Sequence, residues 1–175
     1  MAGLSIEHLR WLDQFVRDDQ KRLLVSFARY LGDWIGAEDV MQDSLVKVLR
    51  LCRSQPDTAP TKALVFRIGM NAAKDSWRKT NRDERLFDQL AMQYPAAVPA
   101  DLAVSHVAAE TLDAMPLLNA QAFLLCKLAK YSSREAGEML ELPPGTVRDK
   151  TAKAIAALRL ALTEYEGGGP DEGDG

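Results

Sequence analysis

The stretch LPPGTVRDKTAKAIAALR, residues 142–159, sets two prolines and a glycine directly before a segment with helical periodicity. Proline fits the first turn of a helix, because its missing N–H breaks no hydrogen bond there, so Pro143 and Pro144 predict a sharply started helix over 144–163. The side predicted to be buried carries Val147, Thr151, Ala154, Ile155 and Leu158. The opposite side carries Thr146, Asp149, Ala152 and Lys153, flanked by Arg148 and Lys150. Such a polar face is either solvated or contacts a partner.

The residues just before this helix predict a second, shorter one. Ser132 and Glu135 have the spacing of a capping box, which predicts a helix over 133–140. Only three residues separate its end from the proline-started helix. Ala136 and Gly137 are small, as a close approach of two helices requires. A short helix, a tight turn and a helix with a polar face are typical of a helix-turn-helix, although a helical hairpin used for packing alone has the same pattern.

Composition excludes several classes of protein. The 175 residues are 47% hydrophobic and 27% charged, which suits one domain or two small soluble ones. No stretch is apolar enough to span a membrane, and the start MAGLSIEHLRWLDQF mixes charges with apolar residues, so we expect no membrane insertion. Cys52 and Cys126 are isolated and are predicted to be buried thiols. With no metal-ligand spacing, phosphate loop or nucleophile motif, we expect no metal, no cofactor, no catalytic residue and no enzyme activity.

The net charge of −3 is unevenly distributed. Residues 1–80 hold 13 bases and 10 acids, and residues 110–162 hold 7 bases and 6 acids. The tail TEYEGGGPDEGDG, 163–175, holds 5 acids and no base. Both helical bodies are therefore slightly basic, and the acidity of the whole chain does not exclude a nucleic-acid partner.

Helical periodicity dominates the chain, so we predict an all-α fold of two small helical domains joined by a flexible linker. The expected helices are 4–30, 36–54, 60–80, 105–115, 118–129, 133–140 and 144–163. The expected domains are 1–85, a linker 86–107, a helix-turn-helix domain 108–163 and a disordered acidic tail 164–175.

The segment GAEDVMQDSLVKVLRLCR is predicted to present an acidic outer face. Its inward stripe is Met41, Leu45, Val48 and Cys52. Its outward stripe is Asp39, Gln42, Asp43 and Val46. An exposed valine beside two carboxylates suits a docking surface for a basic partner, and a solvated face with one stray valine is equally compatible with this pattern.

The segment PTKALVFRIGMNAAKDSWRKTNR separates an aromatic side from a basic one. The predicted core stripe is Phe66, Met70, Ala73 and Trp77. The neighbouring polar stripe is Arg67, Asn71, Lys74 and Arg78. Residues 62–82 contain six bases and one acid. A basic strip with an amide beside aromatic residues favours contact with a DNA backbone and an unstacked base.

These three segments, in this order, resemble an extracytoplasmic-function (ECF) sigma factor of the sigma-70 family over about residues 10–85 and 108–162. AEDVMQDSLVKVLR is similar to region 2.2, and FRIGMNAAKDSWRK is similar to regions 2.3–2.4. The stretch from LDAMPLLNAQ to the final AIAALR is similar to region 4. Each piece alone is a weak signal, whereas the three together are specific.

The resemblance implies a cytoplasmic sigma factor that directs core RNA polymerase to specific promoters and helps to melt the −10 region. It implies that the chain binds the β′ clamp and β flap of core polymerase and promoter DNA, with an anti-sigma factor as a further candidate partner. The implied polymerase contacts are Asp39, Gln42, Asp43 and Val46. The implied −10 DNA contacts are Arg67, Asn71, Lys74, Arg78 and Lys79. The implied −35 DNA contacts are Thr146, Arg148, Asp149, Lys150 and Lys153.

Three residues depart from the family pattern. Leu64 stands where the family usually has tryptophan, which implies altered contacts during strand separation. Asp149 stands where the family usually has a small polar residue. A carboxylate can accept a hydrogen bond from the amino group of cytosine but repels phosphate, so we expect unusual −35 specificity. Glu141 stands where a turn former is common, so we expect the end of the preceding helix to be less well capped.

Two alternative functions remain open from the sequence. One is a sigma-like mimic that binds an anti-sigma partner instead of promoter DNA, and the basic strip of 62–82 argues against it. The other is a simple helix-turn-helix repressor, which leaves the acidic face of 39–46 without a role.

Overall fold

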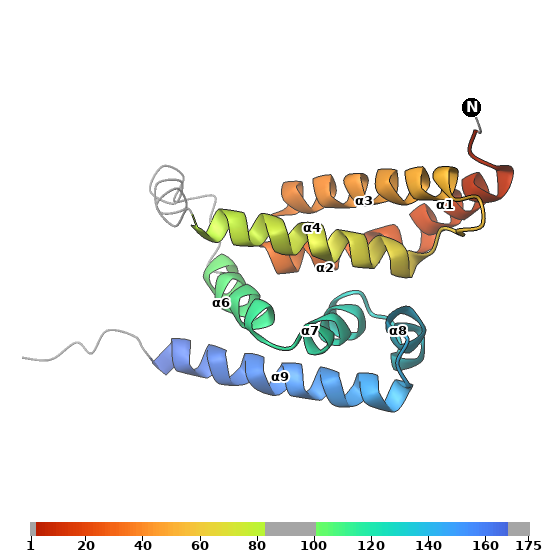
Figure 1. The fold of residues 1–175 in the computed structure, drawn as a ribbon. Coiled ribbons are helices and arrows are strands. Elements are labelled where there is room, and N and C mark those ends of the chain that lie inside the picture. The colour runs from red at the N-terminus through yellow and green to blue at the C-terminus, as the bar shows by residue number, and fades with distance from the viewer. Residues whose placement is uncertain (1–2, 83–100, 168–175) are drawn as a thin grey trace, which may run out of the picture.

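The computed structural model describes residues 3–82 and 101–167, and every regular element in these ranges is a helix (Figure 1). The predicted all-α fold is confirmed there. The helices are α1 (Ile6–Asp18), α2 (Gln20–Leu31), α3 (Trp34–Ser54), α4 (Lys62–Arg82), α6 (Asp101–Ala114), α7 (Leu117–Phe123), the π-helical turn η1 (Leu124–Leu128), α8 (Ser133–Leu140) and α9 (Pro144–Gly167). No helix in the described ranges is both long and apolar enough to span a membrane.

The single helix predicted over 4–30 is wrong, because the chain forms α1 and α2 with a break at Asp19. The backbone N–H of Asp19 still donates to the carbonyl of Phe15, which closes α1. The Asp19 side chain makes no cap hydrogen bond to α2 and instead contacts residues far along the chain. Apolar spacing continues through the break, so periodicity alone could not detect it.

Helices α2, α3 and α4 pack around the core of the N-terminal half. Phe66, Met70, Ala73 and Trp77 are buried as predicted, as are Met41, Val48 and Cys52, while Leu45 is half-buried. The rings of Phe27 and Phe66 stack at 6.3 Å between centroids. Gly69 lies against Phe27 so closely that a Cβ there would come within 2.2 Å of its ring, so the contact between α2 and α4 requires glycine. Cys52 is a buried free thiol, and Cys126 is a half-buried one.

The predicted pair α8 and α9 is present in the C-terminal half. Ser132 and Glu135 form the predicted capping box at the start of α8. At the end of α8, Glu141 adopts a left-handed conformation (φ 57°), and its N–H donates to the carbonyl of Gly137. The expectation of a poorly capped end is therefore wrong: Glu141 itself takes the conformation that glycine usually supplies. Of the predicted α9 stripe, Val147, Thr151, Ala154 and Leu158 are buried and Ile155 is half-buried.

Several helix boundaries differ from the predicted ones. Helix α6 begins at Asp101, within the stretch expected to be linker, and α9 continues to Gly167, four residues into the expected tail. The helix predicted over 118–129 ends in the π-helical turn η1. The rest of the linker from 86 and of the tail beyond 167 lies outside the described residues.

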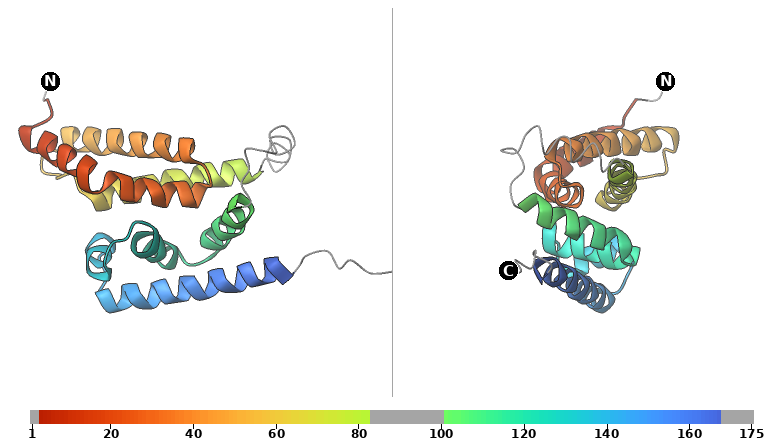
Figure 2. Two further views of the ribbon diagram at one scale, coloured as in Figure 1. Left: turned by 180° about the vertical axis from the view of Figure 1, so that it is seen from behind. Right: turned by 90° about the vertical axis from the view of Figure 1, so that its left-hand side faces the viewer.

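The two halves are stacked as layers (Figures 1 and 2). Helices α1–α4 form one layer, and α6–α9 form the other, with α9 along its outer side. Helix α2 packs against both α6 and η1, and α4 contacts α8. The faces predicted to bind partners are thus presented by one body rather than by two separate ones.

Candidate polymerase and DNA interfaces

Helix α3 presents the outward stripe predicted from the sequence. Asp33 caps the helix by accepting from the N–H groups of Ile35 and Gly36, which fixes where the helix begins. Asp39, Gln42, Asp43 and Val46 are all exposed, and we call them the candidate docking face. Val46 is 44% exposed, as the outward stripe predicts.

The exposed apolar surface beside the candidate docking face extends one turn further than the sequence analysis placed it. Ile35 is 72% exposed, and it precedes Asp39 by four residues on the same helix. Trp34 is also exposed, and its indole N–H donates to the carboxylate of Glu38. The same helical spacing that identified Val46 could have identified Ile35.

Helix α4 carries the predicted basic strip of Arg67, Asn71, Lys74 and Arg78. Arg67, Asn71, Arg78 and the neighbouring Lys79 are exposed. Lys74 is half-buried because the C-terminal half covers it. The strip therefore has an open part near Arg67 and a part where half-buried Lys74 and exposed Arg78 lie beside another residue of the chain.

Asp113 in α6 is that residue. One carboxylate oxygen, Oδ1, lies 3.6 Å from Nζ of Lys74 and 3.5 Å from Nε of Arg78. The same oxygen accepts a hydrogen bond from the hydroxyl of Tyr30 at 3.3 Å. Burial, and after it the charge of Asp113, raises the pKa of the Tyr30 phenol, so this hydroxyl stays protonated and donates. We call these four residues the Asp113 contact; the sequence analysis did not identify it.

Helix α9 presents the predicted −35 contacts on the outer side of the molecule. Arg148, Asp149 and Lys153 are exposed, whereas Thr146 and Lys150 are half-buried. Nζ of Lys153 lies 3.0 Å from Oδ2 of Asp149, one turn away on the same helix. Asp149 therefore offsets the charge of one of the cations predicted to contact DNA.

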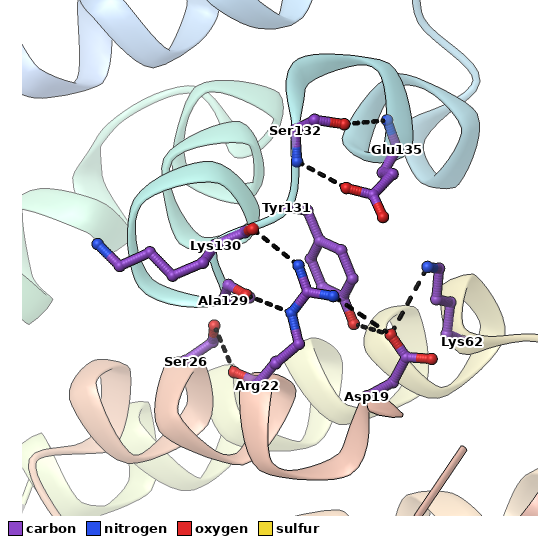
Figure 3. A network of polar contacts seen from close by, with 9 residues as sticks. All are labelled: Asp19, Arg22, Ser26, Lys62, Ala129, Lys130, Tyr131, Ser132 and Glu135. Carbon is purple, nitrogen blue, oxygen red and sulfur yellow. Dashed lines mark hydrogen bonds and ion pairs between the residues drawn. The ribbon is translucent and has the colours of Figure 1, made fainter. Parts of the chain in front are cut away.

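A second set of contacts, missed by the sequence analysis, joins the halves at the other end of α4 (Figure 3). The hydroxyl of buried Tyr131 donates to Oδ1 of Asp19 at 2.6 Å, and the same oxygen lies 3.6 Å from Nζ of Lys62. The guanidinium of Arg22 lies over the Tyr131 ring, 3.8 Å from its centroid. Burial, followed by the bond to Asp19, raises the pKa of Tyr131 and keeps it a donor. We call these four residues the Tyr131 clasp.

Arg22 and Ser26 also contact the two ends of η1. Arg22 donates from Nε to the carbonyl of Ala129 at 2.8 Å and from a terminal nitrogen to the carbonyl of Lys130 at 2.7 Å (Figure 3). Ser26 Oγ donates to the carbonyl of Leu124 at 3.2 Å. The last carbonyls of a helix lack partners within it, so a cation placed there is favourable.

Comparison with known proteins gives consistent relatives. A family model described as Sigma-70 region 2 matches residues 16–83, which include α2, α3 and α4. The chain is 27% identical over 154 residues to RNA polymerase sigma-E factor of Streptomyces avermitilis, covering 86% of this chain and 84% of that protein. It is 27% identical over 143 residues to RNA polymerase sigma factor CarQ of Myxococcus xanthus, covering 79% and 82%. The solved structure of CnrH in complex with the cytosolic domain of CnrY covers 89% of this chain and 90% of its own, with 26% identity and a TM-score of 0.57.

Proposed function

Because the chain belongs to the sigma-70 family, as a member of the ECF type, we propose that it directs core RNA polymerase to specific promoters and helps to melt the −10 region. The observation that carries the proposal is coverage of both halves: a relative named as a sigma factor aligns over 86% of this chain and 84% of its own length. A sigma factor is an initiation factor and not itself an enzyme. Its place of action is the cytoplasm, where core polymerase is.

The docking face on α3 is the proposed contact with the β′ clamp of core polymerase. It combines the carboxylates of Asp39 and Asp43 with the exposed side chains of Gln42 and Val46. An apolar centre beside acids suits a basic partner helix, because burial of Val46 supplies affinity while the charges set orientation. The exposed Ile35 extends the apolar part of this proposed interface.

The −10 DNA contacts are proposed on α4, from Arg67, Asn71, Lys74, Arg78 and Lys79. Cations along one helix face suit the phosphates of a displaced strand, and the amide of Asn71 suits the edge of an unstacked base. The −35 contacts are proposed on α9, from Thr146, Arg148, Asp149, Lys150 and Lys153. The second helix of a helix-turn-helix presents such residues to the major groove.

The proposed contacts are assigned to the two halves separately. Residues 1–85 would bind core polymerase and the −10 element, and residues 108–163 would bind the −35 element and the β flap. An anti-sigma factor is a further proposed partner. It is supported by the likeness to CnrH, which was solved in complex with the cytosolic domain of CnrY.

Transcription in vitro tests the proposed function. Core polymerase with the chain should initiate from a subset of a genomic promoter library, and core polymerase alone should not. The chain alone should give little shift of the same promoter duplexes in a gel. A chain that shifts a duplex tightly without core polymerase, and supports no transcription with it, would be a helix-turn-helix repressor instead.

The docking face is tested by charge reversal. Asp39→Arg and Asp43→Arg should each weaken binding to core polymerase by about 30-fold or more, because a desolvated reversal at an interface costs about 2–5 kcal/mol. The matched control is Asp57→Arg, an exposed acid in the loop between α3 and α4. Equal affinities of all three variants for core polymerase would show that this face is not part of the interface.

A further inference from the structure

The exposed side of α3 continues past the candidate docking face as one straight line of side chains. Positions 39, 43, 46, 50 and 53 follow one another at alternating steps of four and three residues, so they lie on one side of a helix. The side chains on this line are Asp39, Asp43, Val46, Arg50 and Arg53, and all five are exposed. Helix α3 packs against α2 and α4 and lies on the side of its layer away from α6–α9 (Figures 1 and 2). The line therefore faces outward.

The charge along this line changes sign at Val46. Two carboxylates stand before it, and the guanidinium groups of Arg50 and Arg53 stand after it. Lys47 is also exposed and adds a third cation beside the second half of the line. We call the five side chains of the line, acidic at one end and basic at the other, the dipolar line. The sequence analysis assigned only its acidic half and Val46 to a partner.

The chain does not use these charges internally. In the part of the chain that the structure describes, the charged side chains of the dipolar line and Lys47 form no ion pair. Asp43 and Lys47 have the same spacing of four residues at which Asp149 and Lys153 do pair. The helix dipole favours a cation at Arg53, in the last turn of α3, but it acts only within that turn. The arrangement of the other charges therefore suits a partner.

A protein helix fits the dipolar line better than a nucleic acid does. A phosphate backbone following the line from Arg50 would meet the carboxylate of Asp43 after seven positions, or about 11 Å, and like charges repel. Steps of four and three residues are the spacing at which a second helix packs. From Ile35, which is 72% exposed, to Arg53 the line covers 18 positions. That is about 27 Å, close to the width of the ~800 Å² patch that each partner buries in a standard protein interface.

We propose that the candidate docking face is the acidic half of a longer interface, in which Lys47, Arg50 and Arg53 bind an acidic patch of the same partner. The partner is a helix of core polymerase that is basic opposite Asp39 and Asp43 and acidic opposite the three cations. This inference rests on the proposed function, since it takes core polymerase as the partner of α3. The two charge signs select one orientation and one register of the partner helix, because any other places like charges together.

The direction of one change in affinity tests the inference. Binding of the labelled full chain to core polymerase is measured without DNA. Arg50→Glu makes α3 more acidic, so a partner that is basic throughout would bind this variant more tightly than wild type. A partner that is acidic opposite Arg50 should bind it about 10-fold or more weakly, because the reversed charge faces a like charge. Arg53→Glu is the second variant, since a change in the last turn leaves the rest of α3 intact, and it should weaken binding as well.

Arg10→Glu is the matched control, because it makes the same change of charge at an exposed arginine of α1, and it should bind like wild type. Unchanged or tighter binding of both α3 variants would overturn the inference, and so would an equal loss for Arg10→Glu. The competing partner class is tested by anisotropy with fluorescein-labelled random single-stranded DNA. If Arg50→Glu weakened only this binding, the cations would belong to a nucleic-acid contact instead.

Failure of the proposed function gives a different result from failure of this inference. Wild-type chain that does not bind core polymerase would count against the proposed function. Wild-type chain that binds core polymerase, with no loss in Arg50→Glu or Arg53→Glu, would count against the basic half of the interface alone.

Discussion

Glu141 shows how a single residue can adopt a conformation that its type disfavours. Its φ of 57° closes α8, and the next N–H, that of Leu142, also donates to the carbonyl of Gly137. Gly137 cannot be replaced easily, because a Cβ there would come within 2.5 Å of the carbonyl oxygen of Leu142. Sequence identified the small pair at 136–137 from the need for close approach. It could not show that Glu141 would take the left-handed conformation, since glycine and asparagine are the usual residues there.

We expect Glu141→Gly to stabilise the chain by about 0.5–1 kcal/mol. The substitution removes a left-handed backbone cost of about 1–2 kcal/mol and adds some unfolded-state entropy. The measurement is the urea midpoint of the full chain. Glu138→Gly, inside the same helix, is the control and should lower stability by about 1 kcal/mol. A decrease for both variants would mean that Glu141 makes a favourable contact that outweighs its backbone strain.

Asp149 allows a second prediction at this scale, because its pairing with Lys153 suggests how it acts. If it only offsets the cation, Asp149→Ala should raise affinity for every −35 sequence alike. If it accepts from a cytosine amino group, the same change should alter the preferred base, at a cost of about 1–3 kcal/mol for the original one. Given the 3.0 Å ion pair, we expect the uniform increase. Selection from a randomised −35 library with both proteins measures this, and a changed consensus would contradict it.

At the scale of elements, capping and proline motifs predicted where helices begin, but the sequence did not predict where helices are interrupted. The proline start of α9 and the capping box of α8 were visible because each has a fixed spacing. The break at Asp19 and the π-helical turn η1 leave the apolar spacing intact, so no periodicity argument detects them. Both interruptions are stabilised by distant partners, Tyr131 for Asp19 and Ser26 for the carbonyl of Leu124.

The capping box of α8 predicts a specific pH dependence. Hydrogen bonds from Ser132 lower the pKa of Glu135 below its ordinary value of 4.5. A carboxyl whose pKa is lowered by folding stabilises above its unfolded pKa, and this stabilisation is lost as pH falls through the folded pKa. Glu135→Gln can still accept from the Ser132 N–H but does not titrate there. Wild type should therefore exceed this variant in stability at pH 7, and the difference should shrink below about pH 4.5.

Thermal unfolding of both proteins between pH 7 and pH 3 measures this difference. The control is Glu138→Gln, which removes a charge from the same helix without touching the cap. A difference between wild type and Glu135→Gln that stays constant down to pH 3 would show that ionisation of Glu135 does not contribute to the stability of α8.

At the scale of the whole molecule, the sequence predicted two helical bodies but could not predict how they stack. The residues that join them are 112 positions apart in the bond from Tyr131 to Asp19, and 83 positions apart in the bond from Tyr30 to Asp113. Such pairs have no spacing rule, and each residue alone has the appearance of an ordinary surface or core position. Stacking also changes the interpretation of the site, because the basic strip predicted as one surface is half occupied.

We expect Arg22 to couple the two halves into one cooperative unit. Its two charge-assisted bonds to the carbonyls of Ala129 and Lys130 are worth about 1.5–3 kcal/mol each, and its loss leaves those carbonyls without this donor. Arg22→Ala should therefore convert a single calorimetric unfolding transition into two, or broaden it, as each half unfolds separately. Arg29→Ala, an exposed arginine on the same helix, should leave one sharp transition. One sharp transition in both variants would mean that packing between α2 and α6 couples the halves without Arg22.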